Sequence, residues 1–187
     1  MDSRILFLIV AVVVVAVAIG AWFYLQKQRA ERLRSRFGPE YDHVVKERGD
    51  QKRAEAALEM RQKRVERLVL LPLSPADREA FAQRWRRTQA RFVDDARAAI
   101  TEADELVSDV MNLRGYPVGD FDQRADDVSV DHPQVVENYR TAHDIAMRDQ
   151  TGAADTEDLR RAMVCYRDLF DDLLGSKVQE IPLRKAG

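Results

Sequence analysis

The sequence of 187 residues contains a single cysteine, Cys165. One thiol cannot form an intramolecular disulfide bond, and it cannot supply a zinc site built from cysteine ligands. A lone cysteine is typical of a protein in a reducing compartment. Because Cys165 lies in the helix-like stretch RAMVCYRDLF, we expect a buried or half-buried apolar side chain rather than a nucleophile.

Motifs that carry known chemistry are also missing from the sequence. There is no glycine-rich phosphate-binding loop, no Gly-x-Ser-x-Gly sequence, and no convincing Ser-His-Asp or Cys-His set. No alternating pattern of apolar and polar residues indicates a β-strand. The sequence therefore predicts no enzyme, no catalytic residue and no cofactor.

Histidine is scarce, and two of the three histidines, His132 and His143, lie close in the sequence. A spacing of eleven residues would put both rings on one face of a shared helix. A metal site is disfavoured because His132 precedes Pro133, and because Arg140 stands where a di-iron bundle has its Glu-x-x-His glutamate. The sequence predicts no metal ligand. The alternative is a small-ligand-binding or enzymatic pocket, lined by Tyr116, Asp131, His132, Tyr139 and His143.

The same region is rich in aspartate, which raises the question of a calcium site. The carboxylates are those of Asp120, Asp122, Asp126, Asp127 and Asp131. They lack the EF-hand order of acids around a central glycine closed by a glutamate. We expect a solvated acidic loop instead, in which Asp120 and Asp131 each cap the start of a helix.

Charge is absent from residues 5–25, whose sequence is ILFLIVAVVVVAVAIGAWFYL. A helix of this length measures about 31 Å, enough to cross a hydrocarbon core of about 30 Å. Trp22, Phe23 and Tyr24 fall at its end, where aromatic rings prefer the membrane interface. The alternative is a cleaved signal peptide, but its apolar core is usually only about 7–15 residues long. We predict an uncleaved membrane anchor over residues 1–25.

Positive charge follows this stretch, on Lys27, Arg29, Arg32, Arg34 and Arg36. The positive-inside rule puts these residues and the following chain in the cytoplasm, with the short N-terminus outside. The same side chains are expected to contact anionic lipid headgroups. A periplasmic or extracellular body is the alternative.

The rest of the chain has the patterns of an all-α protein. Gly38 and Pro39 break the helix that leaves the membrane. They lie in a basic juxtamembrane segment and charged stalk helix over residues 26–71, in which Gly49 and Asp50 form a weak point. The stalk has a thin apolar seam, interrupted by Arg61, that is expected to pair weakly, for instance with a second copy. The seam consists of Ala54, Leu58, Val65 and Leu68.

Residues 72–175 are predicted to form a four-helix-bundle-like domain with short connections. Caps and apolar stripes indicate helices that begin near Pro75, Asp95, Val135 and Thr156. Ser74 is the expected cap of the first, whose aromatic stripe with Phe81 and Trp85 is expected in the core. Gly115 ends the second helix. Residues 176–187 are predicted to be a flexible tail.

Four stretches of the chain after the apolar segment are distinctive. They read RFGPEYD, LSPADREAFAQRWRRTQARFVDD, ADELVSDVMNLRGYPVGDFDQRADDVSVDHPQVVENYR and TEDLRRAMVCYRDLFDDLL. Together they resemble an uncharacterised family of bacterial single-span membrane proteins, usually labelled hypothetical or secreted proteins. The resemblance implies a location in the bacterial envelope, and it carries no known activity.

Charge is unevenly divided along the chain. Residues 26–70 carry thirteen Lys and Arg against eight Asp and Glu, whereas residues 94–174 carry eight against twenty. Such a split indicates partners and placement rather than fold. Nucleic acid is disfavoured because the acidic part would repel a phosphate backbone. We predict a structural or protein-interaction module at the bacterial inner membrane, whose acidic surface meets a basic partner or stays off the anionic membrane.

Overall fold

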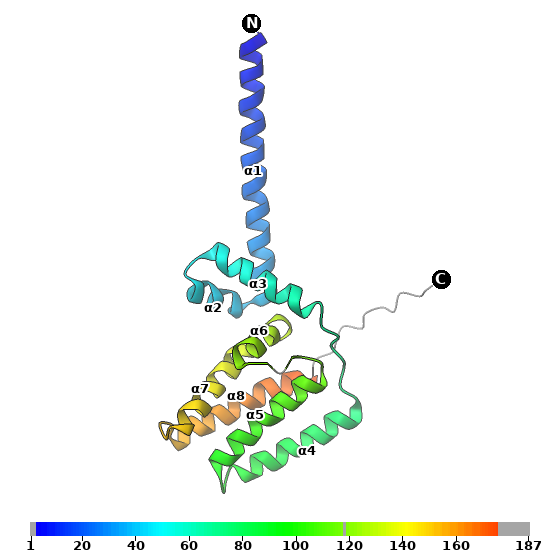
Figure 1. Ribbon diagram of the computed structural model, residues 1–187, viewed down its shortest axis with the longest axis vertical. Helices are drawn as coiled ribbons and strands as arrows, with labels where there is room; N and C mark the ends of the chain where they lie inside the picture. Colours follow the sequence, from blue (N-terminus) through cyan, green and yellow to red (C-terminus); the bar gives the residue numbers. More distant parts are fainter. Residues whose placement is uncertain (1–2, 118, 176–187) are drawn as a thin grey trace, which may run out of the picture. The chain divides into compact units, whose positions relative to one another are not determined.

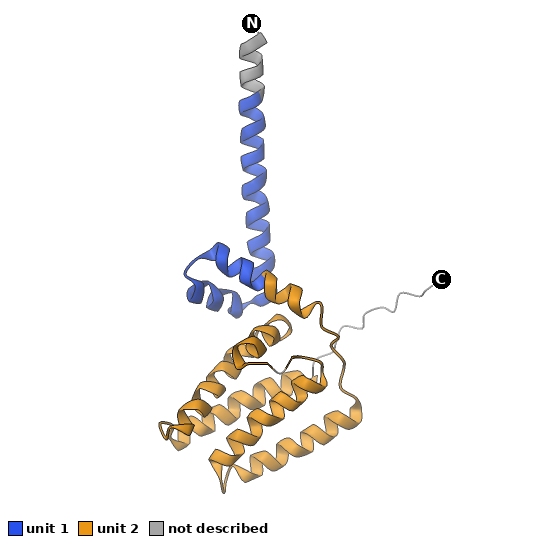
Figure 2. Ribbon diagram, viewed as in Figure 1, with its two compact units in different colours: residues 1–58 blue, residues 59–187 orange. Residues whose placement is uncertain are grey.

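A computed structural model describes the backbone of residues 3–117 and 119–175, with side chains from residue 11 onward (Figure 1). These residues contain eight α-helices and no strand, which confirms the predicted all-α fold. The chain divides into two compact units, residues 1–58 and residues 59–187 (Figure 2). The tail predicted over residues 176–187 lies outside the described residues.

The first unit begins with α1 (Ser3–Phe37), which contains the whole predicted span. Every side chain from Ala11 to Leu25 is exposed, including a run of four valines. By length and composition, α1 is the one described helix that is apolar and long enough to cross a membrane. Its exposed apolar surface contrasts with the buried stripes of the other helices.

α1 ends where the sequence predicts, at Gly38 and Pro39. Gly38 has a φ of 49°, and Pro39 occupies the first turn of α2 (Pro39–Arg48). Glycine tolerates positive φ. Proline suits the first turn of a helix because a backbone N–H at that position would have no acceptor within the helix, so its absence costs nothing. Before this break, α1 buries Leu33 and Phe37, whose exposed fractions are 3% and 0%. The helix therefore changes from an exposed apolar rod to one that packs on its neighbours.

The predicted stalk helix is divided at Gly49 and Asp50 into two helices, α2 and α3 (Gln51–Val65). Gly49 adopts a φ of 66°, and its N–H donates to the Val45 carbonyl at 3.0 Å, which ends α2. Oδ1 of Asp50 then accepts the N–H of Arg53 at 2.8 Å at the start of α3. Two residues of the predicted apolar seam, Ala54 and Leu58, are buried within the first unit. The other buried apolar side chains there come from α1 and α2: Leu33, Phe37, Tyr41 and Val44.

The second unit holds five further helices. They are α4 (Pro75–Arg91), α5 (Ala96–Leu113), α6 (Phe121–Asp131), α7 (Val136–Gln150) and α8 (Thr156–Gly175). α8 packs against α7 and α5, and α4 packs against α5 (Figure 1). Four of the five match the predicted amphipathic helices, whereas α6 lies in the predicted connection.

Capping side chains explain most of the helix starts in this unit. The side-chain oxygens of Ser74, Asp95 and Asp120 each accept a hydrogen bond from the backbone N–H three residues later, at 2.9–3.1 Å. The predicted caps Ser74 and Asp120 are confirmed, whereas Asp95, expected only near the start of its helix, is found as its cap. The predicted cap at Asp131 is wrong. Asp131 is the last residue of α6 and accepts the hydroxyl of Tyr116, and α7 begins with no side-chain cap.

Aromatic side chains join the helices of the second unit in its core. Trp85 of α4 stacks on Phe170 of α8, with ring centroids 4.7 Å apart and planes 19° apart. Tyr139 of α7 and Tyr166 of α8 are fully buried. Phe81 and Trp85 are also buried, so the predicted aromatic stripe of α4 is confirmed as core. Truncating such a ring to alanine typically costs about 3–5 kcal/mol.

Gly115 follows α5 at a point where the backbone crosses another segment. Its φ is 93°, and a Cβ built on it would lie 2.5 Å from the carbonyl oxygen of Val69. The segment that contains Val69 is held there by the N–H of Leu71, which donates to the Arg114 carbonyl at 2.9 Å. Glycine is therefore required both for the backbone angle and for the close approach.

Candidate functional site

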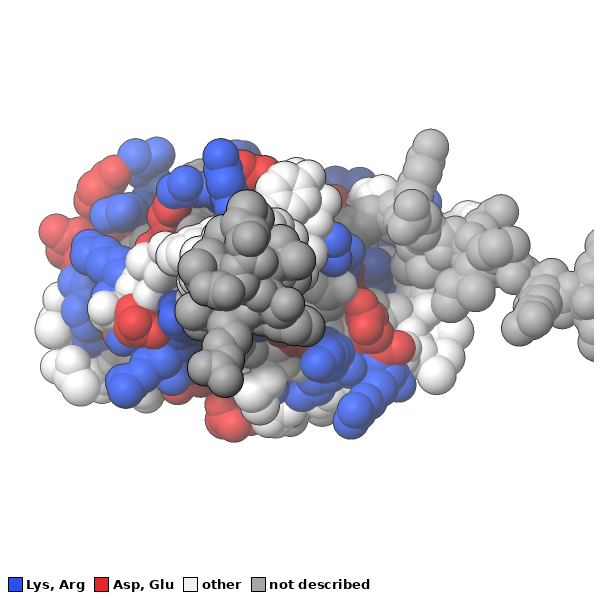
Figure 3. Space-filling view, turned by 90° about the horizontal axis from the view of Figure 1, so that it is seen from above, with Lys and Arg blue, Asp and Glu red and all other residues white. Residues whose placement is uncertain are grey.

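The first candidate site is the set of basic side chains on the last turns of α1. All five residues predicted to contact headgroups are exposed: Lys27, Arg29, Arg32, Arg34 and Arg36. Arg34 Nη2 lies 2.7 Å from Oδ1 of Asp42, and Lys27 Nζ lies 3.9 Å from Glu31. Figure 3 shows a face of the molecule on which Lys and Arg side chains lie among Asp and Glu side chains. The five exposed basic side chains suit a phosphate-rich surface.

The second candidate site is the pair of histidines, which the structure places in different clusters. His132 ends α6 and is 2% exposed, whereas His143 lies on α7 and is half-buried. The two rings therefore do not share one helix, as their spacing of eleven residues would require. Tyr116 and Asp131 lie with His132, while Tyr139 packs on Phe121 beside His143.

Both ring nitrogens of His132 contact protein groups. Nδ1 lies 2.5 Å from Oδ2 of Asp172, and Nε2 lies 3.4 Å from Nη1 of Arg114. A guanidinium only donates, so the ring accepts at Nε2 and donates from Nδ1 to the carboxylate. This hydrogen bond lowers the pKa of Asp172, and partial burial opposes the shift. The same Arg114 nitrogen donates to the Leu173 carbonyl at 2.9 Å. The cluster thus ties together the ends of α5, α6 and α8.

Tyr116 extends this cluster on the side of α6. Its hydroxyl donates to Oδ2 of Asp131 at 2.9 Å, and the guanidinium of Arg114 lies 5.9 Å from its ring centroid. Burial raises the pKa of Tyr116, and the negative charge of Asp131 raises it further. The phenol is therefore held as a hydrogen-bond donor, and it is not poised as a base.

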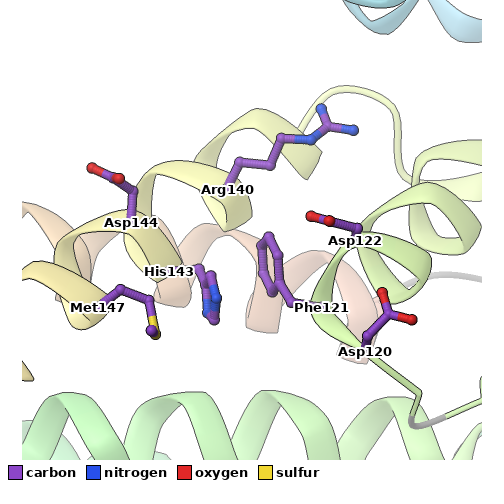
Figure 4. A pocket seen from close by; sticks show the side chains of 7 residues that line it. All are labelled: Asp120, Phe121, Asp122, Arg140, His143, Asp144 and Met147. Carbon is purple, nitrogen blue, oxygen red and sulfur yellow. The ribbon is translucent and has the colours of Figure 1, made fainter.

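His143 lies in a surface groove of about 410 Å³. Its ring stacks on Phe121, with centroids 3.6 Å apart and planes 6° apart. Figure 4 shows the two rings face to face, with the other lining side chains around them: Asp120, Asp122, Arg140, Asp144 and Met147. Burial lowers the pKa of His143, and the charge of Asp104 opposes the shift. The groove offers one imidazole beside surface carboxylates.

Two aspartates of the predicted acidic loop form ion pairs instead of facing solvent. Arg61 Nη2 lies 2.6 Å from Asp126, and Arg64 Nε lies 2.5 Å from Asp127. Arg61 and Asp127 are buried, so the prediction of a solvated loop is wrong for this part of α6. Arg61 interrupts the apolar seam of α3, and that interruption was the signal for a buried partner of opposite charge.

The described residues hold neither a metal-ligand cluster nor an exposed thiol. In residues 11–117 and 119–175, no three His, Cys, Asp or Glu side chains lie together in a way that would hold a metal ion. Cys165 is buried, as predicted, and burial raises the pKa of its thiol. A protonated, buried thiol is a packing residue rather than a nucleophile.

Comparisons with protein-family models, with curated proteins and with solved structures give no match for this chain. The resemblance to a bacterial membrane-protein family therefore stays a prediction.

Proposed function

We propose that this chain is a single-span membrane protein and serves as a structural or protein-interaction module at the bacterial inner membrane. The main support is the exposed apolar surface of α1 from Ala11 to Leu25. Apolar surface in water costs about 25 cal/mol per Å², and a lipid core removes that cost. The helical hydrogen bonds of α1 also satisfy its backbone in a medium without water.

The proposed topology has the N-terminus outside and the body of the chain in the cytoplasm. The exposed basic side chains that follow residue 25 support it, because such residues are retained on the cytoplasmic side. Lys27 and Arg29 would lie among anionic headgroups, with Arg32, Arg34 and Arg36 just beyond them.

The proposed organisation follows the same order as the sequence. Residues 1–25 anchor the chain, residues 26–71 form the membrane-proximal segment, and residues 72–175 form a four-helix-bundle-like domain of α4, α5, α7 and α8. The packing of α4 on α5, and of α5 and α7 on α8, supports this arrangement. A module of this kind acts through its surfaces, which fits a His132 ring whose two nitrogens already have protein partners.

The test combines membrane fractionation with reporter fusions after Gly187. We expect the chain to stay in the membrane pellet after alkaline carbonate, a green fluorescent protein fusion to fluoresce, and an alkaline phosphatase fusion to be inactive. Active phosphatase with a dark fluorescent protein would overturn the topology and place the body in the periplasm. Release of the chain by carbonate would overturn the anchor.

A variant pair sharpens the fractionation. Val14→Arg with Ala18→Arg puts two cations into the middle of the span, each costing about 2.5–3.5 kcal/mol, and should move the chain to the soluble fraction. Ala90→Arg with Val93→Arg adds the same charges at exposed positions at the end of α4 and should leave the chain in the membrane. Equal fractionation of the two variants would contradict insertion of α1.

A further inference from the structure

A contact inside the first unit brings α3 alongside the aromatic end of the apolar segment. Nζ of Lys52, at the start of α3, lies 5.4 Å from the ring centroid of Trp22 on α1. Trp22 also meets Phe23 edge-on, with ring centroids 5.0 Å apart. Lys52 comes thirty residues after Trp22, so only the fold places them together.

This contact shows how far the chain turns back along α1. Trp22 precedes the last residue of α1, Phe37, by fifteen residues, which is about 22 Å of helix. α2 and the start of α3 turn the chain back along α1, and the side chain of Lys52 reaches the level of Trp22. In a membrane-spanning chain, this level is the interface where aromatic rings gather.

The turn, residues 46–53, has the composition of a surface that contacts phosphate groups. Its sequence is KERGDQKR, with no apolar side chain, and its four basic residues are exposed: Lys46, Arg48, Lys52 and Arg53. Of the two acids, Asp50 is engaged in capping α3, and Glu47 lies 3.7 Å from Arg48. A segment without apolar side chains does not insert into hydrocarbon, so its contact with a membrane is electrostatic.

We propose that the α2–α3 turn is a second contact of this protein with anionic lipid headgroups, beside the basic residues that directly follow the span. The inference rests on the proposed membrane anchor. The turn begins more than twenty residues after residue 25 in the sequence. Only the reversal of the chain through α2 brings it to the headgroup layer. The turn binds the phosphates of anionic lipids, and the span alone does not position it.

The test uses the full chain in lipid nanodiscs, which leave both membrane faces open to protease. Trypsin cuts the exposed Arg48–Gly49 bond, and cleavage after the exposed Arg67 serves as an internal reference. In discs of phosphatidylcholine with phosphatidylglycerol, we expect cleavage after Arg48 to be about tenfold slower than in phosphatidylcholine alone, because an anionic surface attracts the basic residues of the turn. Cleavage after Arg67 should not change, and high salt should abolish the protection.

Charge variants complete the test. Lys46→Gln with Lys52→Gln keeps the Arg48–Gly49 bond and should remove most of the lipid-dependent protection. Arg86→Gln with Arg87→Gln removes the same charge from exposed positions on α4 and should leave the protection intact. Equal cleavage in both lipids, or protection that survives the Lys46 and Lys52 changes, would overturn the second contact alone. A chain that fails to enter the discs would overturn the anchor itself.

Discussion

Replacing Gly115 by alanine is expected to destabilise the second unit more than any other glycine-to-alanine change outside the apolar segment. The residue has a φ of 93°, and a Cβ there would lie 2.5 Å from the carbonyl oxygen of Val69. Val69 cannot simply move away, because Leu71 next to it is held by a hydrogen bond of 2.9 Å to the Arg114 carbonyl. The neighbours of Gly115, Arg114 and Tyr116, carry the buried polar cluster around His132.

The expected cost follows from two parts. A non-glycine residue at this φ costs about 1–3 kcal/mol in backbone strain. Moving Val69 far enough to relieve the contact weakens or breaks the Leu71 hydrogen bond, which contributes about 0.5–1.5 kcal/mol. We therefore expect the Gly115→Ala variant to lose roughly 2–4 kcal/mol of unfolding free energy.

The matched control is Gly152→Ala. Gly152 also has a positive φ, 72°, but a Cβ there meets no atom within 4 Å, so this variant carries only the strain. Urea unfolding in detergent, followed by far-ultraviolet circular dichroism, compares the two, with α1 held in the micelle. Equal midpoints for the two variants would refute the steric contact with Val69, and a Gly115→Ala variant as stable as the wild type would refute the backbone angle as well.

Two further predictions concern charged groups. Asp127→Asn leaves the partly exposed Arg64 facing a neutral amide, and it should lower the unfolding free energy measured in urea by about 1–3 kcal/mol. The control Asp109→Asn breaks an exposed pair with Arg84 and should lower it by less than about 1 kcal/mol. Burial lowers the pKa of His143, so the unfolded chain takes up a proton first as the pH falls below about 6.5, and stability should rise with pH in that window. His143→Gln should flatten the slope, and an NMR titration of the His143 ring at or above the ordinary value would contradict the prediction.

The sequence predicted those parts of the fold that local chemistry determines. Ser74 and Asp120 cap helices because a short polar side chain reaches an N–H three residues away, whatever the rest of the chain does. The same holds for the break at Gly38 and Pro39. Periodic apolar stripes then indicated α4, α5, α7 and α8, because each helix hides one face.

The features that depend on contacts distant in sequence were missed. α6 is short and carries many aspartates, so its pattern resembles a loop until Arg61 and Arg64 neutralise two of them. The spacing of His132 and His143 would put both rings on one face only if they shared one continuous helix. Because α6 ends at Asp131, they do not share a helix. Gly49 was recognised as a weak point, but the left-handed turn that reverses the chain cannot be read from one glycine.

The uneven distribution of charge illustrates the same limit of local reasoning. Taken along the sequence, a basic first part and an acidic second part indicate external partners. In the folded second unit, however, Arg61 and Arg64 from the basic part pair with Asp126 and Asp127 from the acidic part. Arg84 and Arg91, which lie between the two parts in the sequence, pair with Asp109 and Glu102. The two exposed pairs, Arg84 with Asp109 and Arg91 with Glu102, contribute little to stability, about 0–1 kcal/mol each, but they still cancel charge at the surface. Part of the charge asymmetry therefore serves the fold, because basic and acidic side chains that are far apart in the sequence neutralise each other within the second unit.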